Sequence, residues 1–251
     1  MTELLYGRHA VLECLRAGRR SIHRVLLAEG VKDAPILRDI VALARSRHVP
    51  IFNTARQNLD RISDHHQGIA VEVGAYPYST VQDMLALAAQ KGEPPLLLIL
   101  DALQDPQNFG NLIRTVEAAG AHGIIIPQRR SVAVTPAVVN ASAGATEHVS
   151  IAQVVNLARE VEALKARDVW IAALQDDPRA QELYAGDLRG ALALIVGSEG
   201  EGVSRLLRER ADFLFKLPMR GRIESLNASV AGAVALYEIL RQRLPAYNRR
   251  S

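Results

Sequence analysis

The feature that most constrains the fold is the alternation of apolar strand-like runs with helical patterns after residue 95. The strand-like runs cover residues 96–100, 123–127, 169–174, 191–196 and 213–217. Helical patterns follow at 111–119, 135–141, 154–166, 203–210 and 225–243. Such alternation is typical of a mostly parallel sheet covered by helices. We therefore predict an α/β fold for this part of the chain.

The first third of the chain predicts a smaller α/β domain that covers residues 1–75. Helical patterns at 2–18 and 35–47 alternate there with strand patterns at 25–27, 50–52 and 68–73. Residues 76–95 are predicted as a linker with a short helix at 81–90, and they end in the Gly-Glu-Pro-Pro boundary 92–95. The main domain is predicted at 96–245 and a tail at 246–251.

The charge of the chain leaves a nucleic-acid partner open. The formal net charge is only +3, yet residues 1–75 carry eleven Lys and Arg against eight Asp and Glu, whereas the remainder is balanced. Only four of the thirty basic residues are lysine. Arginine suits phosphate and base recognition, although a GC-rich coding sequence produces the same bias.

Cysteine usage and hydropathy indicate the compartment. The single Cys14 excludes an intrachain disulfide framework, and its apolar surroundings predict that it packs in a helix. The first residues lack a signal-peptide pattern, and no apolar run reaches the length of a membrane span. We expect a cytoplasmic protein without a membrane partner.

The first segment with chemical potential is 101–114, which leaves a predicted strand and enters a predicted helix. Ligands of open α/β sheets gather at this position. Asn108 is expected in the turn and Arg114 one helical turn later, with Gly110 between them to relax the backbone. Both side chains can then face one crevice. Taken alone, Arg114 reads more simply as a surface ion-pair residue.

The second segment, 194–203, runs from an apolar strand directly into three alternating glycines, the first of which is Gly197. Backbone without side chains allows a close approach to a ligand. No lysine follows, so this is not a Walker loop, and the glycine spacing is not that of a dinucleotide fingerprint. Because Glu199 and Glu201 would repel a polyphosphate, the loop favours a ligand without phosphate.

The third segment, 217–229, turns a strand into the last helix. The Ser225-Leu226-Asn227 sequence leaves polar side chains and free backbone N–H groups at the helix N-terminus. The simplest interpretation is that Asn227 or Ser225 is the N-cap residue. All three segments follow predicted strands of one sheet, so they can converge on one pocket.

The conjunction of the three segments resembles the three motifs of the SPOUT superfamily, in its TrmH (SpoU) branch of RNA ribose 2′-O-methyltransferases. The resemblance spans essentially the whole chain. The opening residues 5–13 and the stretches 142–148 and 155–159 look like the RlmB-type enzymes, which act on guanosine in 23S rRNA. One departure is Asn140, which stands where we expect a basic residue, and this departure implies a weaker RNA contact.

The resemblance implies a specific fold and cofactor. It implies a parallel-sheet SPOUT domain with a C-terminal trefoil knot, preceded by a small L30e/L7Ae-like α/β domain that binds the RNA substrate. The implied cofactor is S-adenosyl-L-methionine, held by main-chain groups of the knot loops. Carried over by motif, the cofactor-binding residues are Gly197, Leu217, Met219, Gly221, Ser225 and Leu226.

The implied reaction is in-line attack of a guanosine ribose 2′-hydroxyl on the methyl group of the cofactor's sulfonium. Catalytic roles carry over to Asn108, Arg114, Glu199, Ser225 and Asn227. Family proposals make Arg114 the general base, but a guanidinium is not deprotonated in proteins. We therefore expect Arg114 to hold phosphate or ribose oxygens, and Glu199 to fix an arginine or the loop, with a solvated turn residue as its alternative.

A homodimer is expected, because the family completes its pocket across a two-fold interface. Apolar residues of the last helix, such as Val230 and Tyr237, could serve that interface or the core alone. No metal site is expected at His65 and His66, which we interpret as RNA contacts or surface residues.

The alternatives to a 23S rRNA guanosine enzyme are a methyltransferase of tRNA or of the rRNA adenosine linked to thiostrepton resistance, and a non-catalytic rRNA-binding assembly factor. A nicotinamide dehydrogenase is disfavoured by the missing phosphate loop.

Overall fold

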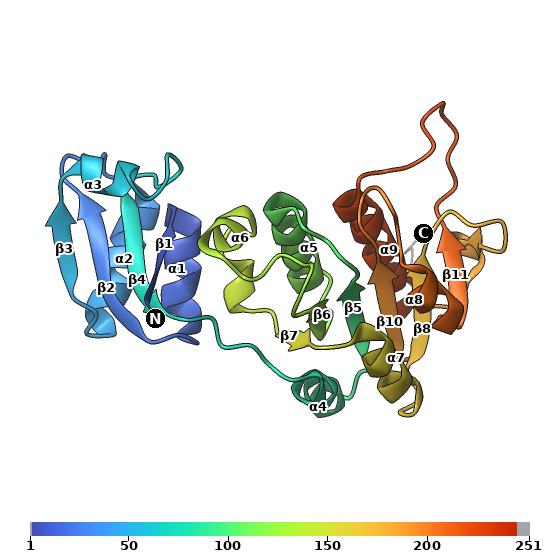
Figure 1. The fold of residues 1–251 in the computed structure, drawn as a ribbon. Helices are drawn as coiled ribbons and strands as arrows, with labels where there is room; N and C mark the ends of the chain where they lie inside the picture. The colour runs from blue at the N-terminus through green and yellow to red at the C-terminus, as the bar shows by residue number, and fades with distance from the viewer. Residues whose placement is uncertain (1, 245–251) are drawn as a thin grey trace, which may run out of the picture. The chain divides into compact units, whose positions relative to one another are not determined.

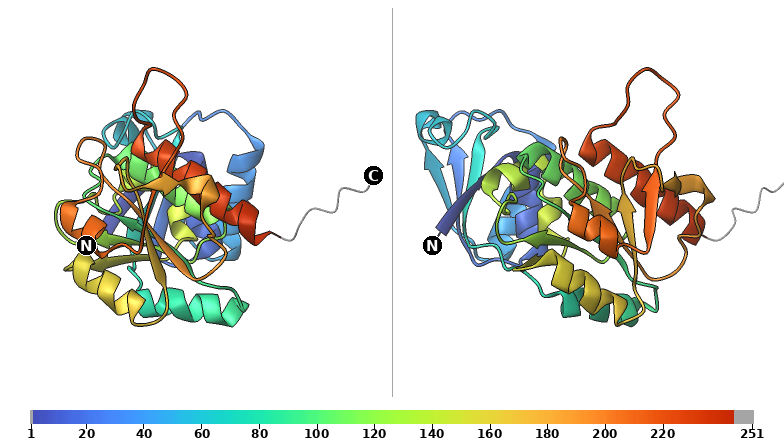
Figure 2. Two further views of the ribbon diagram at one scale, coloured as in Figure 1. Left: turned by 90° about the vertical axis from the view of Figure 1, so that its right-hand side faces the viewer. Right: turned by 45° about the vertical axis from the view of Figure 1, so that its right-hand side comes forward.

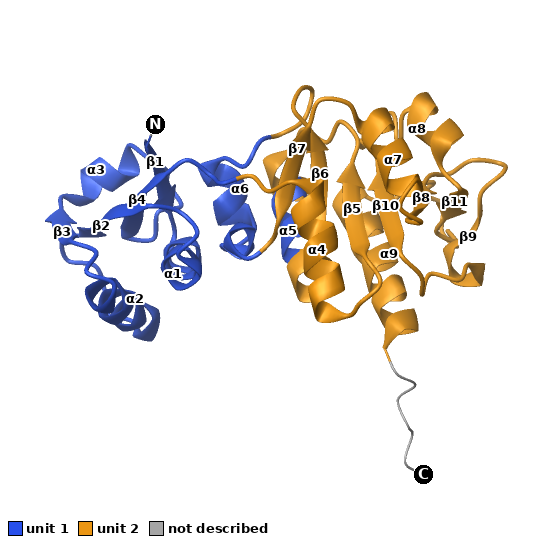
Figure 3. Cartoon of the chain, turned by 90° about the horizontal axis from the view of Figure 1, so that it is seen from below, with its two compact units in different colours: residues 1–77, 109–114, 133–148 blue, residues 78–108, 115–132, 149–251 orange. Residues whose placement is uncertain are grey.

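The computed structural model describes residues 2–244, which form two compact units (Figure 3). Of the described residues, the first unit comprises 2–77, 109–114 and 133–148, and the second comprises 78–108, 115–132 and 149–244. Residue 245 and the predicted tail 246–251 lie outside the described residues. Each unit is built around its own sheet, so that each has its own core.

The first unit contains a four-stranded mixed sheet in the order β1-β4-β2-β3. The central strand β4 pairs antiparallel with β1 and β2, and β3 pairs parallel with β2. Its elements up to residue 77 are β1 (Thr2–Tyr6), α1 (Arg8–Ala17), β2 (Ile22–Ala28), α2 (Pro35–Ser46), β3 (Ile51–Thr54), α3 (Arg56–Asp60) and β4 (Ile69–Gly74).

The helix predicted over residues 2–18 is only partly correct. Residues Thr2–Tyr6 form a strand whose ladder partner is β4, 64 to 72 residues later in the chain, and the helix begins only at Arg8. Gly7 separates the two elements with a φ of 91°, a conformation that glycine adopts without strain. Strand formation at such a position depends on a distant partner, which a local pattern does not reveal.

A later segment packs with these elements in the first unit. It contains α6 (Pro136–Ala141) and a short 3₁₀ helix, η1 (Ala145–Glu147). The Asn140 amide donates a hydrogen bond to the Tyr6 carbonyl over 3.1 Å. The buried Arg20 guanidinium lies 2.8 Å from a Glu3 oxygen and 2.9 Å from a Glu147 oxygen. These contacts attach the segment to the N-terminal sheet of the same unit.

The second unit contains a seven-stranded sheet in the order β7-β6-β5-β10-β8-β11-β9, and every neighbouring pair in it is parallel. The predicted parallel α/β fold is therefore confirmed (Figure 1). Its elements are α4 (Val81–Lys91), β5 (Leu96–Leu100), α5 (Pro106–Ala118), β6 (Gly123–Pro127), β7 (Ile151–Val154), α7 (Leu157–Lys165), β8 (Trp170–Leu174), β9 (Gln181–Glu182), the 3₁₀ helix η2 (Leu183–Ala185), β10 (Leu192–Val196), α8 (Arg205–Arg210), β11 (Phe213–Lys216) and α9 (Ala228–Arg243). The middle part of helix α5, residues 109–114, is grouped with the first unit.

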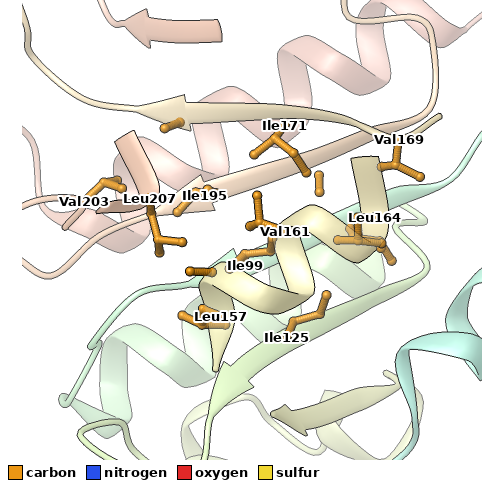
Figure 4. Close-up of a cluster of buried hydrophobic side chains, with 14 of the residues drawn as sticks. Ile99, Ile125, Leu157, Val161, Leu164, Val169, Ile171, Ile195, Val203 and Leu207 are labelled. Atoms are coloured by element: carbon orange, nitrogen blue, oxygen red, sulfur yellow. The ribbon is translucent and has the colours of Figure 1, made fainter. Parts of the chain in front are cut away.

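The core of the second unit lies between the sheet and helices α4, α7 and α8. Alternate strand residues such as Ile99, Ile171 and Ile195 pack there against Val161 of α7 and Leu207 of α8 (Figure 4). Helix α9 covers the opposite face of the sheet (Figure 2). Burial on both faces explains why the central strands read as continuous apolar runs.

Three predicted helices of the second unit begin three to five residues away from their predicted starts. The helix predicted at 154–166 begins at Leu157, with Asn156 as its N-cap residue, and the strand Ile151–Val154 before it was not predicted. The helix predicted at 111–119 begins earlier, at Pro106, and the last helix begins at Ala228 instead of residue 225. The short strand β9 and helix α3 were not predicted.

Two side chains of the first unit that could carry chemistry, Cys14 and His66, are buried. Cys14 is buried, as predicted, and burial raises its pKa to about 12. His66 is also buried, so the prediction of a surface or RNA-contacting role for it was wrong. Its Nδ1 accepts a hydrogen bond from the Gly68 amide, and its Nε2 lies 2.8 Å from an Asp60 oxygen.

Among residues 2–244, no helix is both long and apolar enough to cross a bilayer.

Candidate active site

Three loops meet at one edge of the parallel sheet of the second unit. They follow β5, β10 and β11, and each leaves the carboxyl end of its strand. Strands β5 and β10 are direct neighbours, whereas β8 separates β10 from β11. Because all seven strands are parallel, the three carboxyl ends share one edge, which is where ligands of such sheets bind.

The loop after β5 ends in a well-capped helix. Asp105 is the N-cap residue of α5, and its carboxylate accepts a hydrogen bond from the Asn108 amide N–H over 2.8 Å. Pro106 occupies the first helical turn, where its missing N–H has no cost. Asn108 therefore lies in the first turn of the helix instead of the preceding loop, and it is 7% exposed.

The glycine-rich loop after β10 folds back on itself. Ser198 and Gly202 exchange two backbone hydrogen bonds of 3.0 and 3.2 Å. A side chain at Gly197 would have its Cβ 2.0 Å from the Gly202 carbonyl carbon, so glycine is required there by this close approach. Gln175 supports the turn by accepting a hydrogen bond from the Val203 amide. The turn carries Glu199 exposed at its tip.

The loop after β11, residues 217–227, projects from the second unit between β11 and α9 (Figures 1 and 2). It ends at Asn227, whose Oδ1 accepts hydrogen bonds from the Ser229 and Val230 amides. This confirms Asn227 as the N-cap residue of α9. The predicted residues Met219, Gly221, Ser225 and Leu226 all lie exposed on the projecting loop, and Leu217 is half-buried at its base.

A carboxylate joins the three loops. Glu199 Oε1 accepts a hydrogen bond from Asn108 Nδ2, in the first turn of α5 that the first loop leads into. The same oxygen accepts a second hydrogen bond, over 2.6 Å, from Asn227 Nδ2 of the third loop. Three residues predicted from separate motifs are thus in direct contact, although 91 positions separate Asn108 from Glu199.

Arg114 lies exposed on α5, six residues after Asn108. Six steps of an α-helix turn the chain by about 600°, so the two side chains leave the helix about 120° apart. Gly110 does not relax the backbone between them, because it lies within the regular helix. Its lack of a side chain permits close packing, since a Cβ there would lie 2.5 Å from the Ala141 Cβ.

The sequence did not single out Ser229, which lies at the second position of α9 and is 5% exposed. Its hydroxyl lies 3.0 Å from Asn108 Oδ1 and 2.7 Å from Asn227 Oδ1. The available signal was its spacing, because a polar residue two positions after an N-cap faces the same helix end.

Within the described part of the chain, no group of three or more His, Cys, Asp and Glu side chains is arranged to hold a metal ion.

Two family models match the chain. Residues 95–237 match the SpoU rRNA Methylase family, and residues 4–79 match the family described as RNA 2′-O ribose methyltransferase substrate binding. The two matches together cover both sheets of the structure, and the first one alone covers more than half of the chain.

Similar proteins agree with these matches. A TrmH family protein of Bacillus subtilis (strain 168), YacO, is 41% identical over 245 residues, which are 97% of each chain. The 23S rRNA (guanosine-2′-O-)-methyltransferase RlmB of Pseudomonas putida (strain KT2440) is 39% identical over 242 residues, which are 96% of this chain and 97% of that protein. The SpoU methyltransferase AviRb from Streptomyces viridochromogenes, solved in complex with the cofactor AdoMet, has the same fold. Its TM-score is 0.80 at 22% identity, over 96% of this chain and 90% of that one. The chain therefore belongs to the SpoU (TrmH) family of RNA 2′-O-methyltransferases, which use S-adenosylmethionine as methyl donor.

Proposed function

We propose that this protein methylates the ribose 2′-hydroxyl of a guanosine in 23S rRNA. The observation that carries the proposal is the Glu199 carboxylate, which binds Asn108 and Asn227 and so joins the three motif loops. The guanosine and the 23S rRNA are suggested by the P. putida relative, which is named for that reaction. In this proposal the enzyme acts in the cytoplasm.

The residues of the three loops fit the cofactor chemically. Two carboxylates, Glu199 and Glu201, lie exposed in the glycine-rich turn, and they disfavour a phosphate-bearing ligand but not a sulfonium. Leu226 and Met219 are 42% and 39% exposed, which leaves apolar surface for an adenosine moiety. We propose that Gly197, Leu217, Met219, Gly221, Ser225 and Leu226 hold the cofactor, which when bound supplies an activated methyl group.

The protein's own contribution is alignment of the target ribose and removal of its proton. In this proposal, Arg114 binds the phosphate or ribose oxygens of the target nucleotide as a permanent cation. Asn108, Ser225 and Asn227 orient the nucleoside. Glu199 fixes the two asparagines, because one carboxylate oxygen that accepts two amide donors limits the rotation of both side chains. The 2′-hydroxyl proton leaves late or through water.

Membership of the family also suggests the remaining architecture. We propose that residues 1–75 form the L30e/L7Ae-like RNA substrate-binding domain, that 76–95 link it to the SPOUT catalytic domain 96–245, and that the chain of this domain forms a trefoil knot near its C-terminus. A homodimer would complete the pocket. Two apolar side chains of α9 support this, because Val230 and Tyr237 are 47% and 51% exposed whereas Leu236 is buried.

The direct test is a methyl-transfer assay. The purified protein is incubated with methyl-labelled S-adenosylmethionine and with unmodified 23S rRNA or tRNA, and ribose methylation is then mapped. Labelling of a guanosine in 23S rRNA is the expected result. Labelling of tRNA alone would overturn the substrate, and labelling of neither RNA would favour a non-catalytic assembly factor.

Substitution of Arg114 tests its role. Arg114→Ala should abolish turnover, a loss of about a thousandfold or more, and leave the cofactor Kd within twofold, since the guanidinium is proposed to hold RNA. The control is Arg189→Ala, which removes another exposed arginine, one paired with Asp187, and should keep near-normal turnover. A large loss of cofactor affinity in Arg114→Ala would show that its role is misassigned.

A further inference from the structure

The strongest additional feature of the site is the buried hydroxyl of Ser229. It lies between two side-chain amide oxygens, 2.7 Å from Asn227 Oδ1 and 3.0 Å from Asn108 Oδ1. All four residues of this cluster, Asn108, Glu199, Asn227 and Ser229, belong to the second unit. A hydroxyl has one proton, so Ser229 shares it between two acceptors, one in the first turn of α5 and one at the end of the loop after β11.

The hydrogen bonds fix the orientation of both amides. Asn227 Oδ1 accepts the amide protons of Ser229 and Val230, so its Nδ2 must point away from the helix, toward Glu199. Asn108 Nδ2 also points to Glu199, because a carboxylate only accepts hydrogen bonds. The Asn108 oxygen then faces the Ser229 hydroxyl.

Rotation of Asn108 by 180° would bring its oxygen against the Glu199 carboxylate, so Glu199 determines which way the amide faces. The Ser229 hydroxyl can donate or accept a hydrogen bond, so it does not select between the two orientations. It restrains the position of the amide instead, because it bonds the end of Asn108 that does not face Glu199 and links it to Asn227. Removal of the hydroxyl would leave Glu199 as the only one of these two partners.

We propose that Ser229 is a positioning residue of the methyl-transfer site, a role that rests on the proposed function. Its hydroxyl bonds Asn108 and Asn227 and so holds both side chains in the positions from which their amides bind Glu199. Ser229 touches neither the RNA nor the methyl donor. It acts through the two asparagines, and it couples the first turn of α5 to the first turn of α9.

The kinetic test compares Ser229→Ala with Ser229→Thr. Alanine removes the hydroxyl and favours a helix, so the variant should fold. We expect kcat to fall about tenfold and the KM for RNA and for S-adenosylmethionine to stay within twofold, because one neutral hydrogen bond is lost. Threonine retains the hydroxyl and should keep kcat within about threefold of the wild type.

The matched control is Ser142→Ala, which removes another buried serine hydroxyl, one bonded to the Val139 carbonyl. Its kcat should stay within twofold of the wild type. An unchanged kcat in Ser229→Ala would overturn the proposal. An equal loss of kcat in both serine variants would overturn it as well, because a general effect of removing a buried hydroxyl would then explain the result.

A double substitution distinguishes positioning from a structural role. If Ser229 acts through the asparagines, Ser229→Ala should lower kcat less than threefold when Asn108 is already alanine. A further tenfold loss would show that the two residues act independently, and the proposal would be wrong.

The wild type, Ser229→Ala, Asn108→Ala and the double variant also form a thermal unfolding cycle that requires no activity. If the two side chains bond each other directly, the Tm loss of the double variant should be smaller than the sum of the two single losses. A Tm loss equal to that sum would contradict the direct bond. If the wild type methylates no RNA, the proposed function fails, and this cycle still decides whether Ser229 fixes Asn108.

Discussion

Replacement of Arg20 by methionine should destabilise the first unit strongly. The Arg20 side chain is completely buried, and its guanidinium contacts Glu147 through two nitrogens, at 2.9 and 3.3 Å. A third contact reaches Glu3 at 2.8 Å, and the Tyr76 ring lies 4.9 Å from the guanidinium carbon. Glu147 is also completely buried, so the change leaves one carboxylate without its counter-ion.

The size of the effect follows from this burial. Removal of one partner of a buried ion pair costs about 3–5 kcal/mol, because the remaining charge stays desolvated. In a protein of this size about 1 kcal/mol lowers Tm by roughly 2–4 °C, which gives a fall of roughly 6–20 °C. Glu147→Gln should cost less, because its amide oxygen still accepts a hydrogen bond from Arg20 and Glu3 still balances the charge.

The assay is thermal unfolding followed by circular dichroism. Arg189→Ala is the control, because Arg189 and Asp187 form an exposed pair, with side chains 70% and 64% accessible. Such pairs contribute about 0–1 kcal/mol. If Arg20→Met lowers Tm no more than Arg189→Ala does, the Arg20–Glu147 pair does not hold the segment containing η1 on the N-terminal sheet, and the argument from burial is refuted.

Three further predictions concern single side chains. Burial raises the pKa of Cys14 to about 12, so at pH 8 iodoacetamide should alkylate it about a thousandfold more slowly in the folded protein than in urea; comparable rates would contradict this. Burial lowers the pKa of His122 below its ordinary 6.5, so the unfolded chain binds a proton there that the folded protein does not, and stability should fall as pH drops through 6.5. His122→Gln should flatten this part of the Tm–pH curve, and an unchanged slope would assign the dependence to other groups. Gly110→Ala would bring a Cβ within 2.5 Å of Ala141 and should cost about 1–3 kcal/mol in urea unfolding, whereas Gly190→Ala, with nothing within 4 Å, should have little effect.

Much of the second unit could be predicted from the sequence because its central strands are buried on both faces. The predicted strand at 96–100 agrees with β5 to the residue, and the strand at 123–127 agrees with β6. A continuous apolar run bounded by turn residues is local information, so no tertiary contact is required to recognise it. The Asn227 N-cap was predicted for the same reason, since its hydrogen bonds reach only two and three residues along the chain.

The elements that were missed depend on distant partners. Strand β1 carries a pattern that also suits a helix, and only its ladder with β4 decides between the two. Strand β7 is four residues long and precedes a helix directly, so its pairing with β6 is not visible locally. In both cases the backbone conformation is selected by hydrogen bonds to a segment that the local pattern does not contain.

The sequence by itself determined which residue types follow strands β5, β10 and β11. They are amides at Asn108 and Asn227, a carboxylate at Glu199 and a glycine at Gly197. The tertiary structure alone decided which of them touch. It brought one carboxylate oxygen within hydrogen-bonding distance of two asparagines, and it placed Ser229 behind them. It also paired Arg20 with Glu147 across 127 residues. The physical reason is that hydrogen bonds and ion pairs act over about 3 Å, and only the packing of the sheets and helices brings such distant segments that close.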